Sequence, residues 1–153
     1  MGIDPNNPVV KWCAEGISAE MSGLRDEAVR LYQQAWDART SDYEACIAAH
    51  YVARLQSTSH DTLRWNSEAL RFAEAVKDVA LQEFFPSLYL NLGKSYEDLG
   101  NFEDAKKFYL LAQSAVGALP DGQYAEVVMR GIRGGLDRVT RATGGEAAAA
   151  AHS

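Results

Sequence analysis

The stretch LYLNLGKSYEDLGNFEDAKKFYLLAQ, residues 88–113, decides the predicted fold of this 153-residue chain. Its apolar residues recur at intervals of three and four, which is typical of amphipathic helices, and Gly100-Asn101 interrupts that pattern. Gly93 and Ala105 are small residues at positions where two antiparallel helices can approach closely, while tyrosines can fill the space around that contact. The stretch therefore predicts a tightly packed helix pair.

The same pattern occurs earlier in the chain, beginning at Lys11. Six residues stand there at the same relative offsets as the small and aromatic residues of the first stretch: Trp12, Gly16, Gly23, Ala28, Tyr32 and Ala35. Glu15 and Ala19 depart from the pattern. We therefore expect a second helix pair of the same kind near the N-terminus.

A longer and less regular pair is expected between these two copies. Its helices are predicted at 42–56 and 62–76, with an insertion in the turn that joins them and in the first turn of the second helix. Ser59 or Asp61 is expected to cap the second of these helices, because either side chain can accept a hydrogen bond from a free backbone N–H.

Eight residues of the first stretch fill the characteristic places of a known repeat: Tyr89, Leu92, Gly93, Tyr96, Gly100, Ala105, Tyr109 and Ala112. Over about residues 9–120, the chain resembles the tetratricopeptide repeat family, in particular its small stand-alone bacterial members. The resemblance implies an all-α fold, an α-α superhelix (right-handed solenoid) of about three helix pairs with a C-terminal capping helix. The implied organisation is an extended segment at 1–8, a repeat domain at 9–142 with repeats at 9–42, 43–83 and 86–119 and a capping helix at 122–142, and a flexible tail at 143–153.

The segment from Tyr124 to about Arg141 is expected to form the capping helix. Its apolar residues follow helical spacing, so one face can be buried on the third repeat. Four arginines are expected to face water: Arg130, Arg133, Arg138 and Arg141. Three glycines interrupt the helix at positions 131, 134 and 135, and each weakens it by up to about 1 kcal/mol relative to alanine.

The charge and the cysteine content limit the classes of function. Fifteen basic and 21 acidic residues give a net charge of −6, which argues against nucleic acid as a partner because phosphate binding needs a basic surface. Two cysteines are too few for a disulfide-stabilised secreted scaffold, and no apolar run is long enough for a membrane span. We expect a cytoplasmic protein without membrane contact.

Cys46 and His50 form the one pair that suggests chemistry. Four residues apart on a helix, they have the spacing of metal ligands or of a nucleophile and its base. A metal site needs further ligands, and the nearest candidate, Cys13, would lie roughly 10 Å away on the adjacent repeat. We therefore expect no metal, no cofactor and no enzymatic activity.

The resemblance implies a binding surface. Members of the family bind peptides or partner domains along the concave groove formed by the first helix of each repeat. The corresponding groove positions are Cys13, Ile17, Glu20, Cys46, His50, Arg54, Leu90, Asn91 and Lys94. Cys13 and Ile17 replace the lysine and asparagine with which chaperone-binding members clamp a terminal carboxylate. Asn91 matches the groove asparagine of the family, whose amide can both donate to and accept from a peptide backbone.

The resulting hypothesis is a non-catalytic protein–protein interaction module that binds a partner peptide or helix in its groove. Two alternatives remain open. One is a structural protein that self-associates as a homodimer, and the other is an accessory regulatory subunit of an enzyme.

Overall fold

The computed structural model describes residues 4–77 and 79–151, and these residues form helices and no strands. Seven of the helices are α-helices: α1 (Pro8–Met21), α2 (Arg25–Asp37), α3 (Asp42–Val52), α4 (Ser59–Ala75), α5 (Phe85–Asp98), α6 (Phe102–Ala115) and α7 (Gln123–Ala151). Three are short 3-10 helices: η1 (Ala53–Leu55), η2 (Val79–Phe84) and η3 (Val116–Ala118). The prediction of an all-α chain with seven α-helices is confirmed for this part of the sequence.

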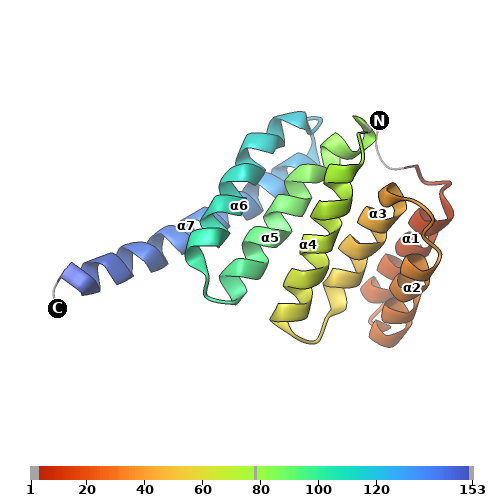
Figure 1. Cartoon of the computed structure of the whole chain (residues 1–153), viewed down its shortest axis with the longest axis horizontal. Coiled ribbons are helices and arrows are strands. Elements are labelled where there is room, and N and C mark those ends of the chain that lie inside the picture. Colours follow the sequence, from red (N-terminus) through yellow and green to blue (C-terminus); the bar gives the residue numbers. More distant parts are fainter. Residues whose placement is uncertain (1–3, 78, 152–153) are drawn as a thin grey trace. The chain divides into compact units, whose positions relative to one another are not determined.

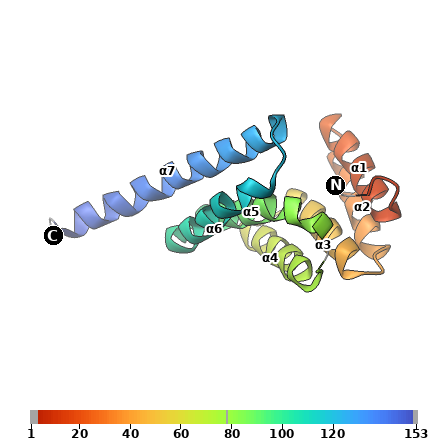
Figure 2. The same ribbon diagram turned by 90° about the horizontal axis from the view of Figure 1, so that it is seen from above.

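The helices belong to two units, Met1–Gln82 and Glu83–Ser153. In the first unit α1 pairs with α2 and α3 pairs with α4, while α3 also packs against α1 and α2 (Figure 1). In the second unit α5 pairs with α6, and α7 packs against both (Figure 2). The first unit is thus two helix pairs packed against each other, and the second is one helix pair with α7 laid against it. The right-handed solenoid expected for the whole chain stays a prediction.

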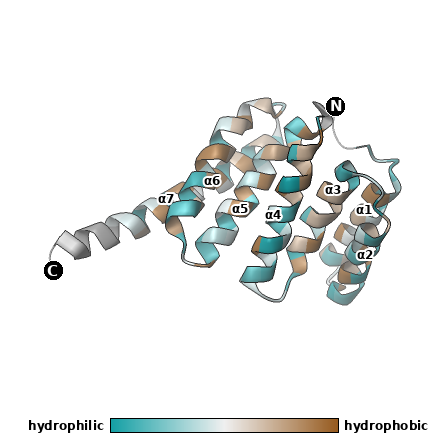
Figure 3. Ribbon diagram, in the orientation of Figure 1, coloured by the Kyte–Doolittle hydropathy of each residue, from teal (hydrophilic) through white to brown (hydrophobic). Residues whose placement is uncertain are grey.

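The core of each unit forms where its helices meet, and Figure 3 shows polar residues along the outer sides of α2 and α4. In the first unit, one cluster of buried side chains contains Ala19, Ala28, Leu31, Tyr32 and Val52. In the second unit, two clusters join α7 to the pair beneath it: Ala112, Leu119, Ala125, Val128 and Ile132 in one, and Ala105, Tyr109 and Val139 in the other.

Glycine and tyrosine set the close approach within the two pairs that the sequence identified. A Cβ atom at Gly93 would lie 2.7 Å from Cδ1 of Tyr109, and one at Gly16 would overlap Cε1 of Tyr32. Both tyrosines are buried. Only glycine leaves room for the ring at these positions, so the small-residue pattern has the packing role that the sequence predicts.

Polar side chains begin four of the helices by accepting a hydrogen bond from a backbone N–H of the first turn: Asn7, Ser41, Thr58 and Asn101. The sequence favours Ser59 or Asp61 as the cap of α4, and this is wrong. Thr58 Oγ1 accepts the bond from the backbone N–H of Asp61, at 3.1 Å. Thr58 has the extended backbone that a cap requires, whereas Ser59 is already the first helical residue.

Pro86 lies in the first turn of α5, where proline is tolerated. Two helix boundaries differ from expectation. α1 begins at Pro8, inside the segment 1–8 that the sequence predicts to be extended. α7 continues to Ala151 instead of ending near residue 142, which the high helix propensity of its alanine run favours. Within the described residues, no helix combines the length and apolar character of a membrane span.

Candidate functional site

The nine predicted groove residues are divided between the two units. Six belong to the first unit: Cys13, Ile17 and Glu20 on α1, Cys46 and His50 on α3, and Arg54 on η1. Three belong to the second unit, on α5: Leu90, Asn91 and Lys94.

The two thiols lie in the core. Cys13 is 1% exposed and Cys46 is 0% exposed, and burial raises the pKa of each thiol to about 12. Both thiols are free. Their side chains present almost no surface to a partner, so the structure assigns them to packing rather than to an open groove.

Glu20 and Arg54 contact each other. The guanidinium donates to the carboxylate through Nη2, at 2.7 Å from Oε2, and through Nε, at 3.1 Å from Oε1. Tyr32 also donates its hydroxyl to Glu20 Oε1, at 2.9 Å. The Arg54 guanidinium holds the pKa of the Glu20 carboxyl below its usual value, while burial raises the pKa of Tyr32. We call this arrangement of glutamate, tyrosine and arginine a clasp.

The second unit contains a second clasp of the same composition. Tyr109 donates to Glu97 Oε1 at 2.7 Å, and Arg138 Nε donates to Glu97 Oε2 at 2.7 Å. Burial opposes ionisation of Glu97, yet the hydrogen bonds from Arg138 and Tyr109 hold the carboxyl pKa below its usual value. Arg138 is expected from the sequence only to face water. It is half exposed and also binds α7 to the pair α5–α6.

The two clasps occupy equivalent places in their pairs. Glu97 and Tyr109 follow Glu20 and Tyr32 by 77 residues, and the arginine comes in both cases from the helical segment laid against the pair. The spacing of glutamate and tyrosine was a signal in the sequence that could have identified the clasps. The arginines could not be found in this way, because Arg54 and Arg138 stand at different distances from their glutamates.

His50 and Ile17 are both half-buried. The imidazole meets the ring of Tyr51 edge-on, with the centroids 5.0 Å apart. Burial, with a smaller contribution from the Arg54 charge, lowers the pKa of His50 to about 4, so the imidazole is neutral at pH 7. Among the described residues, no group of three or more His, Cys, Asp or Glu side chains could hold a metal ion.

Of the predicted residues of the second unit, Leu90 lies against α7, at Gly131. We define the α5–α7 face by its members on the two helices: Ser87, Leu90, Asn91, Lys94, Tyr124 and Val127. Tyr124 is 53% exposed and its hydroxyl contacts Ser87 Oγ, while Val127, three residues further along α7, is 55% exposed. Lys94 binds Asp98 at 2.6 Å. The face therefore combines two exposed apolar side chains with polar neighbours, and Tyr124 and Val127 were not predicted as members.

Two glycines allow α7 to approach this pair. A Cβ at Gly131 would lie 3.1 Å from Cδ2 of Leu90, and one at Gly135 would overlap the ring of Tyr109. The sequence suggests only that these glycines weaken the helix. The structure shows their packing role, and it also shows that Leu90 is partly covered by α7 and contributes to the core clusters of the second unit.

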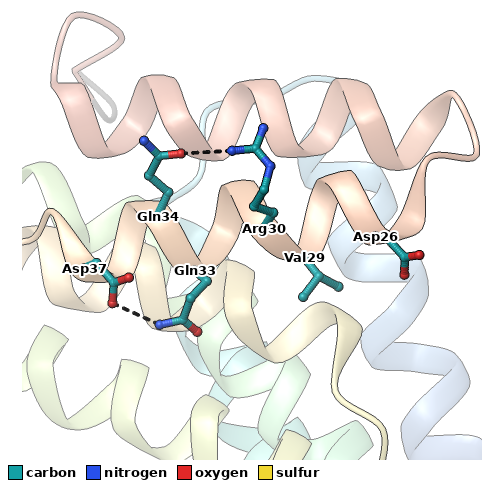
Figure 4. Close-up of a pocket in the computed structure, with 6 residues that line it drawn as sticks. All are labelled: Asp26, Val29, Arg30, Gln33, Gln34 and Asp37. Atoms are coloured by element: carbon teal, nitrogen blue, oxygen red, sulfur yellow. Dashed lines mark hydrogen bonds between the residues drawn. The ribbon is translucent and has the colours of Figure 1, made fainter.

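Figure 4 shows a shallow depression on the first unit, with walls that all come from α2: Asp26, Val29, Arg30, Gln33, Gln34 and Asp37. Its polar side chains bond to one another along the helix, as Gln33 does to Asp37 at 3.0 Å. Val29 is 42% exposed. A single helix cannot enclose a ligand, so we do not favour this depression as a site.

Trp36 and Trp65 are partly buried side chains of the first unit. Both pack against the core of the first unit, and their rings meet edge-on with centroids 4.9 Å apart. The guanidinium of Arg39 lies 3.6 Å from the centroid of the Trp36 ring. This cation–π contact covers a ring that would otherwise be partly open to water.

No protein-family model matches the sequence, and no curated protein is detectably similar to it. The resemblance to tetratricopeptide repeats thus rests on the residue pattern described above and stays a prediction.

Proposed function

We propose that this chain is a non-catalytic protein–protein interaction module of the tetratricopeptide type, which binds a peptide or helix of a partner. The observation that carries the proposal is the recurrence of one arrangement in both units. The Gly16–Tyr32 and Gly93–Tyr109 contacts are equivalent, and each pair binds the next helical segment through a clasp. Repetition of one helix-pair unit is the basis on which repeat proteins build binding surfaces.

The α5–α7 face is the preferred binding surface. Tyr124 and Val127 are exposed apolar side chains in neighbouring positions on α7, and aromatic side chains are frequent anchors at protein interfaces. Leu90, which lies against Gly131 of α7, is half-buried and adds apolar surface to this face. A partner segment with two or three apolar side chains on one side would fit such a surface.

The predicted groove residues of the first unit offer less exposed surface to a partner. Its two thiols are buried, and Glu20 and Arg54 are joined in a clasp, so these four predicted residues serve the fold of the unit. Partner binding is therefore proposed for the second unit.

The test is partner capture from an extract of the native cells, with the wild-type chain and two variants as bait. Tyr124→Ser combined with Val127→Ser removes the exposed apolar side chains of the face. Leu110→Ser is the matched control, because Leu110 is 43% exposed on α6 and lies outside the face. We expect quantitative mass spectrometry to show proteins that the control retains and the double variant loses, at unchanged helix content by circular dichroism.

If the double variant captures the same proteins as the Leu110→Ser control, the α5–α7 face is not the binding surface. Turnover of a substrate by the purified chain would contradict the non-catalytic assignment.

A further inference from the structure

The contact between α7 and the pair α5–α6 is specific at three successive points. Gly131 lies against Leu90, Gly135 lies against the Tyr109 ring, and Arg138 pairs with Glu97. The three residues of α7 are four and three positions apart, so they form one stripe along the helix. The surface of α5–α6 thus selects a helix with two small residues four positions apart and an arginine three positions later.

Apolar burial follows the same stripe. Val128 and Ile132 pack into one core cluster, and Val139, which is 0% exposed, packs against Ala105 and Tyr109 in another. Val139 is also the last buried residue of α7 up to position 144. Up to position 144, the contacts that hold α7 therefore lie between Tyr124 and Val139, while the helix continues to Ala151, beyond the end of α6 in both views (Figures 1 and 2).

The connection before α7 is short and largely exposed. After η3, Leu119 is buried, but Pro120, Asp121 and Gly122 are exposed. Gly122 has a φ of 155°, which glycine adopts at little cost. A change of direction in these three residues would carry α7 away from its own pair without altering either surface of the contact.

We propose that α7 exchanges between two copies of this chain, so that the α7 of each copy packs on the α5–α6 pair of the other. The helix that replaces α7 on each α5–α6 pair comes from a second copy of this chain. The α7 of that copy carries the required glycines, apolar residues and arginine, and the charge of its Arg138 complements that of Glu97. All contacts of the closed unit are kept in the exchanged dimer, which is the condition under which helix exchange costs little. The inference does not rest on the proposed partner binding.

Concentration decides between the closed and the exchanged form. A helix tethered by a short linker is present at an effective concentration of the order of millimolar, so the closed form prevails in dilute solution. Exchange should accordingly increase at high protein concentration.

A pair of charge-reversal variants tests the exchange. Glu97→Arg in one copy and Arg138→Glu in a second copy each place like charges in the copy's own clasp. In a mixture of the two, helix exchange restores opposite charges in both clasps at once. We expect native mass spectrometry to detect a one-to-one heterodimer, at a dimer fraction about tenfold above that of either variant alone.

The matched control carries both substitutions in one chain, which restores opposite charges within the closed unit. If this double variant regains the thermal stability of the wild type while the mixture stays monomeric at every concentration, the proposal is overturned. If the single variants do not fold, two preparations of the wild-type chain are mixed instead. One carries a donor dye on α6, and the other carries an acceptor dye on α7. Energy transfer that rises with concentration supports exchange, and its absence up to millimolar protein overturns it.

Discussion

The phenol ring of Tyr109 fills the space that a side chain at Gly135 would need, since a Cβ atom there would overlap the ring carbon Cζ. The same ring also lies against Gly93, and its hydroxyl donates to Glu97 at 2.7 Å. One tyrosine of α6 therefore sets the approach of both α5 and α7. The ring cannot rotate away without losing a partly buried hydrogen bond.

Substitution of Gly135 by alanine should destabilise the second unit. The added methyl group forces Tyr109 or α7 to move, and such overpacking costs about 1–3 kcal/mol. The measurement is the free energy of unfolding in urea. Gly144→Ala is the matched control, because Gly144 lies in the same helix with nothing within 4 Å of its Cβ position. We expect the control to be neutral or stabilising by up to about 1 kcal/mol. Equal effects of both changes would show that the Tyr109 contact does not limit the packing of α7.

In each clasp, the glutamate and the arginine should show a small coupling energy in the free energy of unfolding. In a double-mutant cycle with Glu97→Gln and Arg138→Gln, we expect a coupling of about 1 kcal/mol, because the arginine side chain is 52% exposed and the glutamate only 12%. The cycle with Glu20→Gln and Arg54→Gln should give a value of the same size. Added salt should reduce both couplings. Zero coupling in both cycles would contradict the role of the clasps in holding the following helical segment.

His50 should make the first unit sensitive to mild acid. Its pKa is lowered from 6.5 to about 4 in the folded chain, so between these values the unfolded chain binds a proton that the folded chain does not. The contribution of the neutral His50 side chain to the free energy of unfolding is fully present above pH 6.5 and is lost as the pH falls toward 4. We expect a loss of roughly 1–2 kcal/mol between pH 7.5 and 5.0.

The measurement is urea unfolding at both pH values, with His50→Gln as the comparison. The loss attributable to His50 should be absent in the variant. A titration midpoint of the His50 ring near pH 6.5 by NMR would contradict the prediction.

The thiols of Cys13 and Cys46 should be unreactive in the folded chain. Burial raises both pKa values from 9.0 to about 12, which reduces the thiolate fraction at pH 8 about 1000-fold, and the core also excludes the reagent. Reaction with Ellman's reagent should therefore be slower than in urea-unfolded protein by at least that factor. Rapid modification of one thiol under native conditions would show that its helix opens readily.

The residue pattern by itself determined the helix pairs and their internal contacts. The spacing of small and aromatic residues predicted that Gly93 and the tyrosines of 88–113 pack between two helices, and the contact of Gly93 with Tyr109 confirms this. Such a prediction succeeds because residues three and four positions apart share a helix face, and because a short turn leaves two successive helices side by side.

Only the tertiary structure decided which side chains from different segments meet. The sequence places Arg138 in water and Leu90 in an open groove, whereas the fold pairs the first with Glu97 and covers the second with Gly131 of α7. Helical spacing defines which residues share a face, but it carries no information on the helix that will lie opposite. Which helix lies opposite depends on the fit of whole surfaces. For this reason, only the tertiary structure showed that the two thiols are buried and that Tyr124 and Val127 belong to the α5–α7 face.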